Sequence, residues 1–163
     1  MLSVKALRKS FDGFLAVKNA SLQVEKGDVA AVIGPNGAGK TTLFHLITGQ
    51  LTPTSGTIRF KGEDIGGLPP YLVCRRGISR SYQVVNLFSR LTVFENVQVA
   101  VLSHQKKTFR LFRPAKTMAV AETHEILKSV GLFDKRDMVS SALSHGDQKV
   151  LEVAVALGTR PEL

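Results

Sequence analysis

One stretch of the sequence carries the residue types needed to hold a phosphate group. It reads Gly34-Pro35-Asn36-Gly37-Ala38-Gly39-Lys40-Thr41-Thr42 and matches the pattern G-x-x-x-x-G-K-[ST]. Glycines let the backbone turn so that successive N–H groups converge on an anion. Lys40 supplies a positive charge for the β- and γ-phosphates, and the Thr41 hydroxyl supplies a Mg²⁺ ligand. The pattern predicts a nucleoside triphosphate site over residues 34–42, the phosphate loop.

The segments on either side have the patterns that this chemistry requires. Residues 29–33 form an apolar run rich in β-branched side chains between glycines, which predicts a strand buried on both faces. Residues 41–48 place apolar side chains at helical spacing and stop at Gly49. Such a helix directs the positive end of its dipole at the phosphate loop.

Further elements of the first half are marked by alternation and by Gly and Pro. Residues 20–25 alternate apolar and polar side chains, which is typical of a half-buried antiparallel strand, and residues 56–60 predict another strand. Pro69-Pro70 predicts the start of a short helix that ends at Gly77.

The second half has helical patterns. Thr92 and Glu95 have the spacing of a capping box, and apolar residues follow on one stripe. Residues 119–130 carry an apolar arc before Gly131. Residues 150–157 are apolar almost all round except Glu152, which predicts a well-buried helix.

Composition limits the class of protein. The chain has 163 residues and a net charge of +9, which suits nucleic acid or an anionic membrane face without choosing between them. A single cysteine, Cys74, excludes an internal disulfide. No uncharged apolar run is long enough to span a bilayer and no signal-peptide core is evident, so we expect a cytosolic protein. The basic run at 104–116 is typical of an exposed loop or a solvated helix face.

A second segment, together with the phosphate loop, carries a family resemblance. Leu143-Ser144-His145-Gly146-Asp147-Gln148 resembles the signature sequence Leu-Ser-Gly-Gly-Gln of ATP-binding-cassette (ABC) transporter nucleotide-binding subunits, with His145 in place of the first glycine and Asp147 after the second. The sequence around these motifs, including Arg80-Ser81-Tyr82-Gln83, is most similar to that of branched-chain amino acid importers. Amide and urea importers are nearly as similar. The resemblance implies an α/β fold: a P-loop NTPase (RecA-like) core, an antiparallel β subdomain and an α-helical signature subdomain.

The resemblance also implies roles for single residues, with ATP and Mg²⁺ as cofactors. Phe11 matches the aromatic residue that stacks on adenine, although a plain turn or core aromatic is the alternative. Gln83 matches the glutamine that contacts Mg²⁺ and the attacking water, a catalytic role that it shares with Lys40. Ser144 and Gly146 match the helix end that faces the γ-phosphate held by the opposite subunit. Ser144 also has the position of an N-cap, with Asp147 three residues on, and the two roles are compatible.

Organisation and partners follow from the same resemblance. We expect a β subdomain with the phosphate-loop part of the core at 1–84, a helical subdomain at 85–158, and the start of a core strand at 159–163. The implied partners are a second nucleotide-binding subunit in a head-to-tail dimer, membrane-spanning permease subunits and, indirectly, a solute-binding protein. No nucleic acid is expected. The implied location is peripheral, on the cytoplasmic face of the inner (plasma) membrane.

Two catalytic parts of the family pattern are missing from the sequence. Phosphoryl transfer needs a carboxylate for Mg²⁺ and a group that polarises water, which the family supplies from an apolar strand ending in Asp-Glu and from a later histidine. Glu63-Asp64 precedes the signature and has the wrong order. We therefore expect a cassette truncated before that strand, which alone is poorly stable or self-associating and hydrolyses ATP negligibly.

Two other functions remain open from the sequence. A cassette ATPase acting on nucleic acid or ribosomes would suit the basic charge, although such proteins usually carry two cassettes. A fragment that binds ATP without turnover is the second. Residues 83–97 favour the importer, because they resemble the loop that docks to a membrane subunit.

Overall fold

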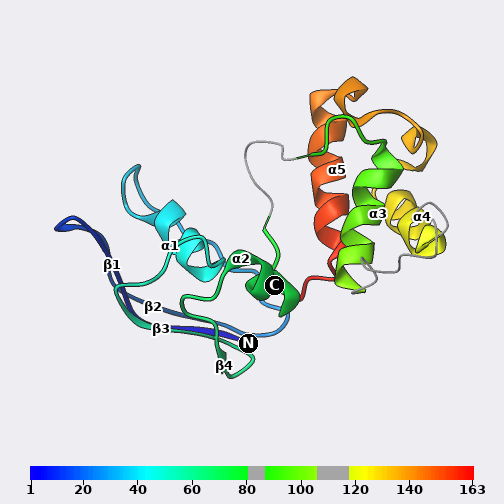
Figure 1. The fold of residues 1–163 in the computed structure, drawn as a ribbon. Helices are drawn as coiled ribbons and strands as arrows, with labels where there is room; N and C mark the ends of the chain where they lie inside the picture. Colours follow the sequence, from blue (N-terminus) through cyan, green and yellow to red (C-terminus); the bar gives the residue numbers. More distant parts are fainter. Residues whose placement is uncertain (81–86, 106–117) are drawn as a thin grey trace. The chain divides into compact units, whose positions relative to one another are not determined.

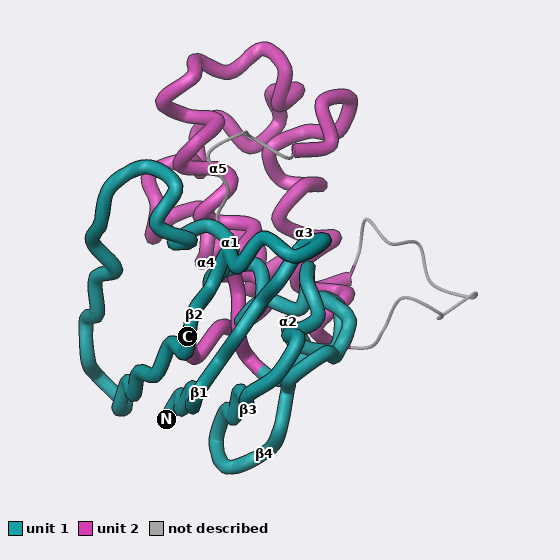
Figure 2. The backbone as a smooth tube through the Cα atoms, turned by 90° about the vertical axis from the view of Figure 1, so that its left-hand side faces the viewer, with its two compact units in different colours: residues 1–76 teal, residues 77–163 magenta. Residues whose placement is uncertain are grey.

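The computed structural model describes residues 1–80, 87–105 and 118–163. The chain divides into two compact units, residues 1–76 and residues 77–163, which Figure 2 draws in different colours. Gln83 lies outside the described residues, as does most of the basic run at 104–116. Each unit is described by itself.

The first unit is built on an antiparallel sheet (Figure 1). Its strands are β1 (Leu2–Phe11), β2 (Phe14–Val24), β3 (Ser55–Phe60) and the two-residue β4 (Glu63–Asp64), in the order β2-β1-β3-β4. The strands predicted at 20–25 and 56–60 are thereby confirmed. Asp12 and Gly13 both have positive φ and form a two-residue hairpin turn, which sets Phe11 opposite Phe14.

Alternation of side chains buries one face of this sheet. Leu2, Val4, Ile58 and Phe60 are at most 3% exposed. The register of β1 against β3 shifts between Lys5 and Arg8, where Ala6 has a φ of 48°. Gly56 accommodates the shift, because a Cβ there would lie 2.5 Å from the Ala6 carbonyl oxygen.

Two helices complete the first unit and lie over one side of the sheet in Figure 1. Helix α1 spans Lys40–Ile47 and buries Leu43, Leu46 and Ile47. Helix α2 spans Pro70–Arg75 and has proline at its first position. Both helices were predicted from apolar spacing and from Gly and Pro, and both are confirmed.

The strand predicted at 29–33 is wrong. These residues have no strand conformation, and Val29 and Ile33 are 101% and 91% exposed. A buried parallel strand needs neighbours on both edges to satisfy its backbone N–H and C=O groups. The sheet that the described residues form is antiparallel and does not include this segment. An apolar β-branched run therefore stays irregular and exposed where no pairing partner reaches it.

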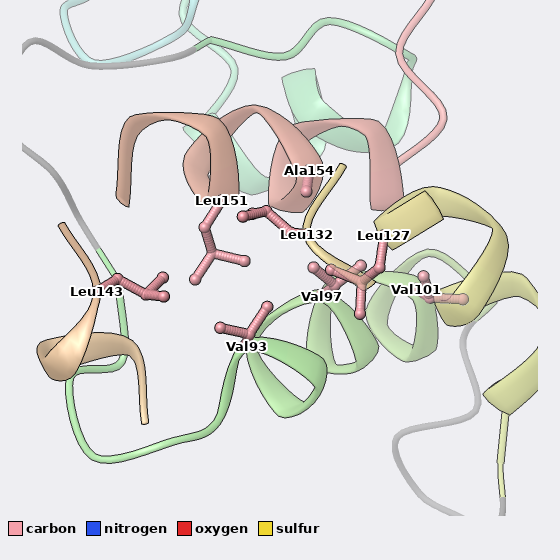
Figure 3. Close-up of a cluster of buried hydrophobic side chains, with 8 residues drawn as sticks. All are labelled: Val93, Val97, Val101, Leu127, Leu132, Leu143, Leu151 and Ala154. Carbon is pink, nitrogen blue, oxygen red and sulfur yellow. The ribbon is translucent and has the colours of Figure 1, made fainter. Parts of the chain in front are cut away.

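The second unit is a helical bundle. It comprises helices α3 (Val93–His104), α4 (Val120–Ser129) and α5 (His145–Gly158), and two short 3₁₀ turns, η2 (Phe133–Lys135) and η3 (Ser140–Ala142), lie between α4 and α5. Their apolar faces meet in one cluster, whose side chains point toward one another in Figure 3. This cluster comprises Val93, Val97, Val101, Leu127, Leu132, Leu143, Leu151 and Ala154.

The start of α3 is fixed by two sets of hydrogen bonds. The predicted capping box is present, since Thr92 Oγ1 accepts from the Glu95 N–H and Glu95 Oε2 accepts from the Thr92 N–H. Asn96, which is 1% exposed, donates to the carbonyl oxygens of Phe88, Leu91 and Thr92. The side-chain Oδ1 of Asn96 accepts a hydrogen bond from the Phe88 N–H, so the Asn96 side-chain amide connects the preceding loop to the helix.

Helix α5 is less buried than its composition predicted. Val150, Val153 and Leu157 are 36%, 47% and 40% exposed, whereas Glu152 is only 9% exposed. The reason is geometric: α3 and α4 cover one side of α5, and a helix in a small bundle buries a stripe rather than its whole surface. The expectation of a helix buried all round is corrected accordingly.

A short parallel pairing joins the two ends of the second unit. The Leu163 N–H donates to the Gly77 carbonyl at 3.0 Å, and the Ser79 N–H donates to the Leu163 carbonyl at 2.8 Å. This alternation of donor and acceptor is that of a parallel ladder. Ile78, between the two paired residues, is 4% exposed.

The packing of the helical unit can be tested by comparing two residues of α5. Leu151→Ala should lower the free energy of unfolding by about 2–5 kcal/mol, because it empties space in the buried cluster. Val153→Ala, two positions on and 47% exposed, should change it by about 0.5 kcal/mol or less. Urea unfolding followed by circular dichroism measures both. Equal losses in the two variants would show that the cluster is not the core of this unit.

Candidate functional site: the phosphate loop and the signature helix

The N-terminus of α1 is open and has the features that suit an anion. Gly39 is its N-cap and has a left-handed conformation, with a φ of 83°. No side chain caps the helix, and its first turn holds no acidic residue. The first N–H groups of α1 and the positive end of its dipole are thus available to a ligand.

Gly39 is also the point where β2 meets the phosphate loop. A Cβ at this position would lie 2.3 Å from the Ala16 carbonyl oxygen, which is closer than real atoms approach. Any residue but glycine would have to displace the β2 backbone or the loop, and its positive φ adds strain. Gly37 has the same φ of 83° but no atom within 4 Å of a built Cβ, so its requirement is conformational alone.

Lys40 holds the loop in shape. Its Nζ donates to the Gly34 carbonyl at 2.6 Å and to the Pro35 carbonyl at 2.8 Å. These bonds place the ammonium inside the turn of the loop. The Ala38 N–H closes the turn by donating to the Pro35 carbonyl at 3.2 Å. A positive charge is therefore fixed where the glycine-rich backbone would receive phosphate.

A cavity of about 390 Å³ adjoins the loop. Its walls come from β2, from the segment before the loop and from the loop with the first turn of α1, and they include Ala16, Ile33, Gly37 and Lys40. Thr41 is exposed, and Thr42 is half-buried. Phe11 does not line this cavity. It lies at the end of the β1–β2 hairpin, 40% exposed, with the Lys9 ammonium 4.9 Å from its ring centroid.

The signature segment forms the N-terminus of α5. Ser144 is the N-cap, and its Oγ accepts a hydrogen bond from the Asp147 N–H at 3.2 Å, as the sequence predicted. The Ser144 hydroxyl in turn donates to Asp147 Oδ2 at 2.7 Å. Gly146 is exposed, and a Cβ there would meet only Ser144 Oγ, at 3.9 Å. The helix end is thus open on the Gly146 side.

Lys135 is a member of this arrangement that the sequence analysis missed. Its Nζ lies 2.7 Å from Asp147 Oδ2, the same oxygen that Ser144 contacts. The hydrogen bond from Lys135 lowers the pKa of the Asp147 carboxyl, and the bond from Ser144 lowers it further. The two residues are separated by a turn and η3, so no helical or strand spacing in the sequence pointed to the pair.

The structure therefore assembles two separate groups of predicted site residues. The phosphate loop, 34–42, is assembled in the first unit, and Ser144 with Gly146 in the second. In the described parts of the chain, no group of three or more His, Cys, Asp or Glu side chains is arranged to hold a metal ion. Nor is any helix there long and apolar enough to cross a membrane.

Comparison with known proteins decides the family. Residues 17–163 match the family described as ABC transporter. The chain belongs to the ABC transporter family. Over its whole length it is 38% identical to the high-affinity branched-chain amino acid transport ATP-binding proteins LivG of Salmonella typhimurium and BraF of Pseudomonas aeruginosa, and it spans 67% of each. It is 35% identical to the sulfate/thiosulfate import ATP-binding protein CysA 2 of Shewanella oneidensis, of which it spans 44%.

Solved structures of ABC proteins share the fold. A nucleotide-free ATP-binding cassette from an ABC transporter superimposes with a TM-score of 0.81 at 32% identity. The ADP conformation of the cassette MJ1267 superimposes with a TM-score of 0.82 at 30% identity. Each comparison covers 98% of this chain and 65% of the other. The expected fold class is confirmed at the level of the ABC ATPase domain.

The Lys135–Asp147 pair predicts a defined pH dependence. Because the folded-state pKa of Asp147 is lowered, the carboxylate stabilises the fold fully above its ordinary pKa of about 3.8, and this stabilisation is lost as pH falls through the folded-state value. Wild type should be more stable than Asp147→Asn at pH 7, and the difference should shrink below about pH 4. Urea unfolding at several pH values measures this.

The controls are Lys135→Gln and Asp134→Asn. Lys135→Gln should remove much of the same pH-dependent difference, because it deletes the larger cause of the lowered pKa. Asp134 is exposed, and Asp134→Asn should leave the profile unchanged. A difference between wild type and Asp147→Asn that grows with falling pH would contradict the assignment.

Proposed function

We propose that this chain is the ATP-binding part of an ABC importer, which couples ATP binding and hydrolysis to solute transport. The observation that carries the proposal is the phosphate loop: a lysine ammonium fixed inside a glycine-rich turn at an uncapped helix N-terminus. This is the arrangement that a triphosphate needs, because backbone N–H groups, helix dipole and lysine all favour negative charge at one point.

The residues of the phosphate loop have different roles in the proposed site. Backbone N–H groups at the start of α1 bind the phosphates, and Lys40 exchanges its bonds with the Gly34 and Pro35 carbonyls for phosphate oxygens. The Thr41 hydroxyl is exposed beside this end and suits a Mg²⁺ ion, which prefers oxygen ligands and neutralises phosphate charge. The absence of an acidic residue from the first turn of α1 fits a trianionic or tetraanionic ligand.

Four other predicted residues, Phe11, Gln83, Ser144 and Gly146, complete the proposed site. The exposed ring of Phe11 stacks on adenine, with Lys9 over the ring. Gln83 would contact Mg²⁺ and orient the attacking water. Ser144 and the open side of Gly146 receive the γ-phosphate bound by a second nucleotide-binding subunit, in a head-to-tail dimer.

The relatives favour a solute and a set of partners. LivG and BraF are named for branched-chain amino acid transport, which makes these amino acids the favoured solute, while CysA 2 is named for sulfate and thiosulfate. Permease subunits in the membrane and, through them, a solute-binding protein are the proposed partners. The chain would then act peripherally, at the cytoplasmic face of the inner membrane.

Turnover is a separate question from binding. The 163 residues contain no Asp-Glu pair at the end of an apolar strand beyond the signature segment. Phosphoryl transfer depends on such carboxylates to hold Mg²⁺ and to orient water. We therefore propose that these residues by themselves bind ATP but hydrolyse it negligibly.

Nucleotide binding is tested at Lys40. Lys40→Ala should weaken ATP binding by about 10- to 100-fold, since a charge-assisted hydrogen bond contributes about 1.5–3 kcal/mol. Isothermal titration calorimetry with Mg-ATP measures this, and Lys26→Ala, an exposed lysine outside the loop, is the control. Full affinity in Lys40→Ala would overturn the phosphate-loop assignment. Salt-sensitive RNA binding with no affinity for a permease would favour the nucleic-acid ATPase instead.

The role of the signature helix is tested at Ser144. Ser144→Ala should weaken ATP-dependent dimer formation, because it removes a hydroxyl from the helix end that faces the partner's phosphate. Sedimentation velocity with and without ATP measures dimer formation. The control is Ser141→Ala, an exposed serine shortly before the helix, and thermal unfolding shows how much of any loss comes from the lost N-cap. Undiminished ATP-dependent dimerisation of a folded Ser144→Ala protein would contradict the role.

A further inference from the structure

A second cavity of the first unit lies on the sheet and shares no residue with the cavity at the phosphate loop. It has a volume of about 540 Å³. Residues of β1, the end of β2, and β3 with the turn after it form its walls. They are Met1, Leu2, Ser3, Lys5, Gln23, Thr57, Arg59, Lys61 and Gly62. We call this cavity the β-face pocket.

Sheet register explains why positive charge gathers in the β-face pocket. Ser3 pairs with Arg59, and Lys5 pairs with Thr57, so the side chains of Lys5 and Arg59 are diagonal neighbours on one face of the sheet. Val4 and Ile58, which alternate with them, are buried on the other face. Like charges so placed on adjacent strands repel each other, and a bound anion would relieve the repulsion.

The nearby carboxylates contact groups other than Lys5 and Arg59, and Glu25 bonds to Met1 and to the Gln23 amide at the edge of the pocket. Glu25 binds the N-terminal ammonium of Met1 at 2.8 Å, and Asp64, across the sheet from Arg59, accepts from the Gly66 N–H at 2.8 Å. Glu63 pairs with Arg76. Within the described residues, neither the Lys5 ammonium nor the Arg59 guanidinium has an ion-pair or hydrogen-bond partner. No carboxylate belongs to the lining of the pocket.

We propose that the β-face pocket binds a small soluble anion that carries phosphate groups. The Arg59 guanidinium offers a planar fork for bidentate contact with phosphate oxygens, and Lys5 adds a mobile point charge. The Ser3 and Thr57 hydroxyls supply neutral donors beside them. The volume of the pocket is within the range, about 300–1,000 Å³, of cavities that take small ligands.

The same chemistry could be presented by a lipid headgroup, and the pocket favours the soluble source. Recognition of anionic membranes relies on clusters of about four to eight Lys or Arg side chains on an open surface. The lining of the β-face pocket has three such side chains, Lys5, Arg59 and Lys61, and they surround a concave space.

Binding of inorganic pyrophosphate tests the proposal. In the chain carrying Lys40→Ala, binding at the phosphate loop is weakened, and calorimetry should still detect binding at the β-face pocket. Adding Arg59→Gln should weaken that binding about 10-fold or more, as expected for loss of a charge-assisted contact, and Lys5→Gln should also weaken it. Arg8→Gln is the matched control: Arg8 is exposed on β1 outside the pocket, and its loss should change the affinity less than about two-fold.

Three outcomes would overturn the proposal. They are no pyrophosphate binding in the Lys40→Ala protein, an equal loss in Arg8→Gln and Arg59→Gln, and binding only to phosphatidylglycerol vesicles in a sedimentation assay. ATP affinity of the chain with Lys40 intact should be unaffected by Arg59→Gln. This last measurement separates the β-face pocket from the phosphate loop, so either assignment can fail without the other. Circular dichroism confirms that the variants fold.

Discussion

The close approach of Gly39 to the Ala16 carbonyl is the contact on which the proposed phosphate site depends. It sets the loop against β2, with room for nothing larger than hydrogen on the Gly39 Cα. Because the same residue is the left-handed N-cap of α1, it also fixes where the helix begins. Lys40, the next residue, is thereby aimed back at the carbonyls of Gly34 and Pro35. One backbone contact thus determines the position of the helix dipole and of the lysine charge.

The positively charged side chains lie in several separate places rather than in one patch. Lys40 lies inside the phosphate loop, Lys135 neutralises Asp147 at the signature helix, and Lys5 with Arg59 faces the β-face pocket. Each group has a different kind of negative partner: for Lys40 the proposed nucleotide, for Lys135 a carboxylate of the chain itself, and for Lys5 with Arg59 the proposed second anion. A net charge of +9 therefore gives no argument by itself for nucleic acid.

Local rules predicted much of the fold. Helix α1 was predicted from apolar side chains at helical spacing that stop at Gly49, and the start of α3 from the Thr92–Glu95 capping box. Both are local signals, which act wherever the segment lies. The strand expected at 29–33 depends on neighbours that the sequence cannot guarantee, and its prediction was wrong. The prediction that α5 is buried all round was wrong for the same reason, because neighbouring elements decide which side of a helix is covered.

The sequence by itself determined the chemistry of the phosphate loop and of the signature segment. Both are contiguous, so residue type and spacing already contain the glycine turns, the lysine and the capping serine. Three contacts were decided by the tertiary structure alone. They are the ion pair of Lys135 with Asp147, the close approach of the Ala16 carbonyl to Gly39, and the diagonal placement of Lys5 and Arg59 on the sheet. These contacts join residues far apart in the chain, and their formation rests on strand register and helix packing, which no local pattern of side chains encodes.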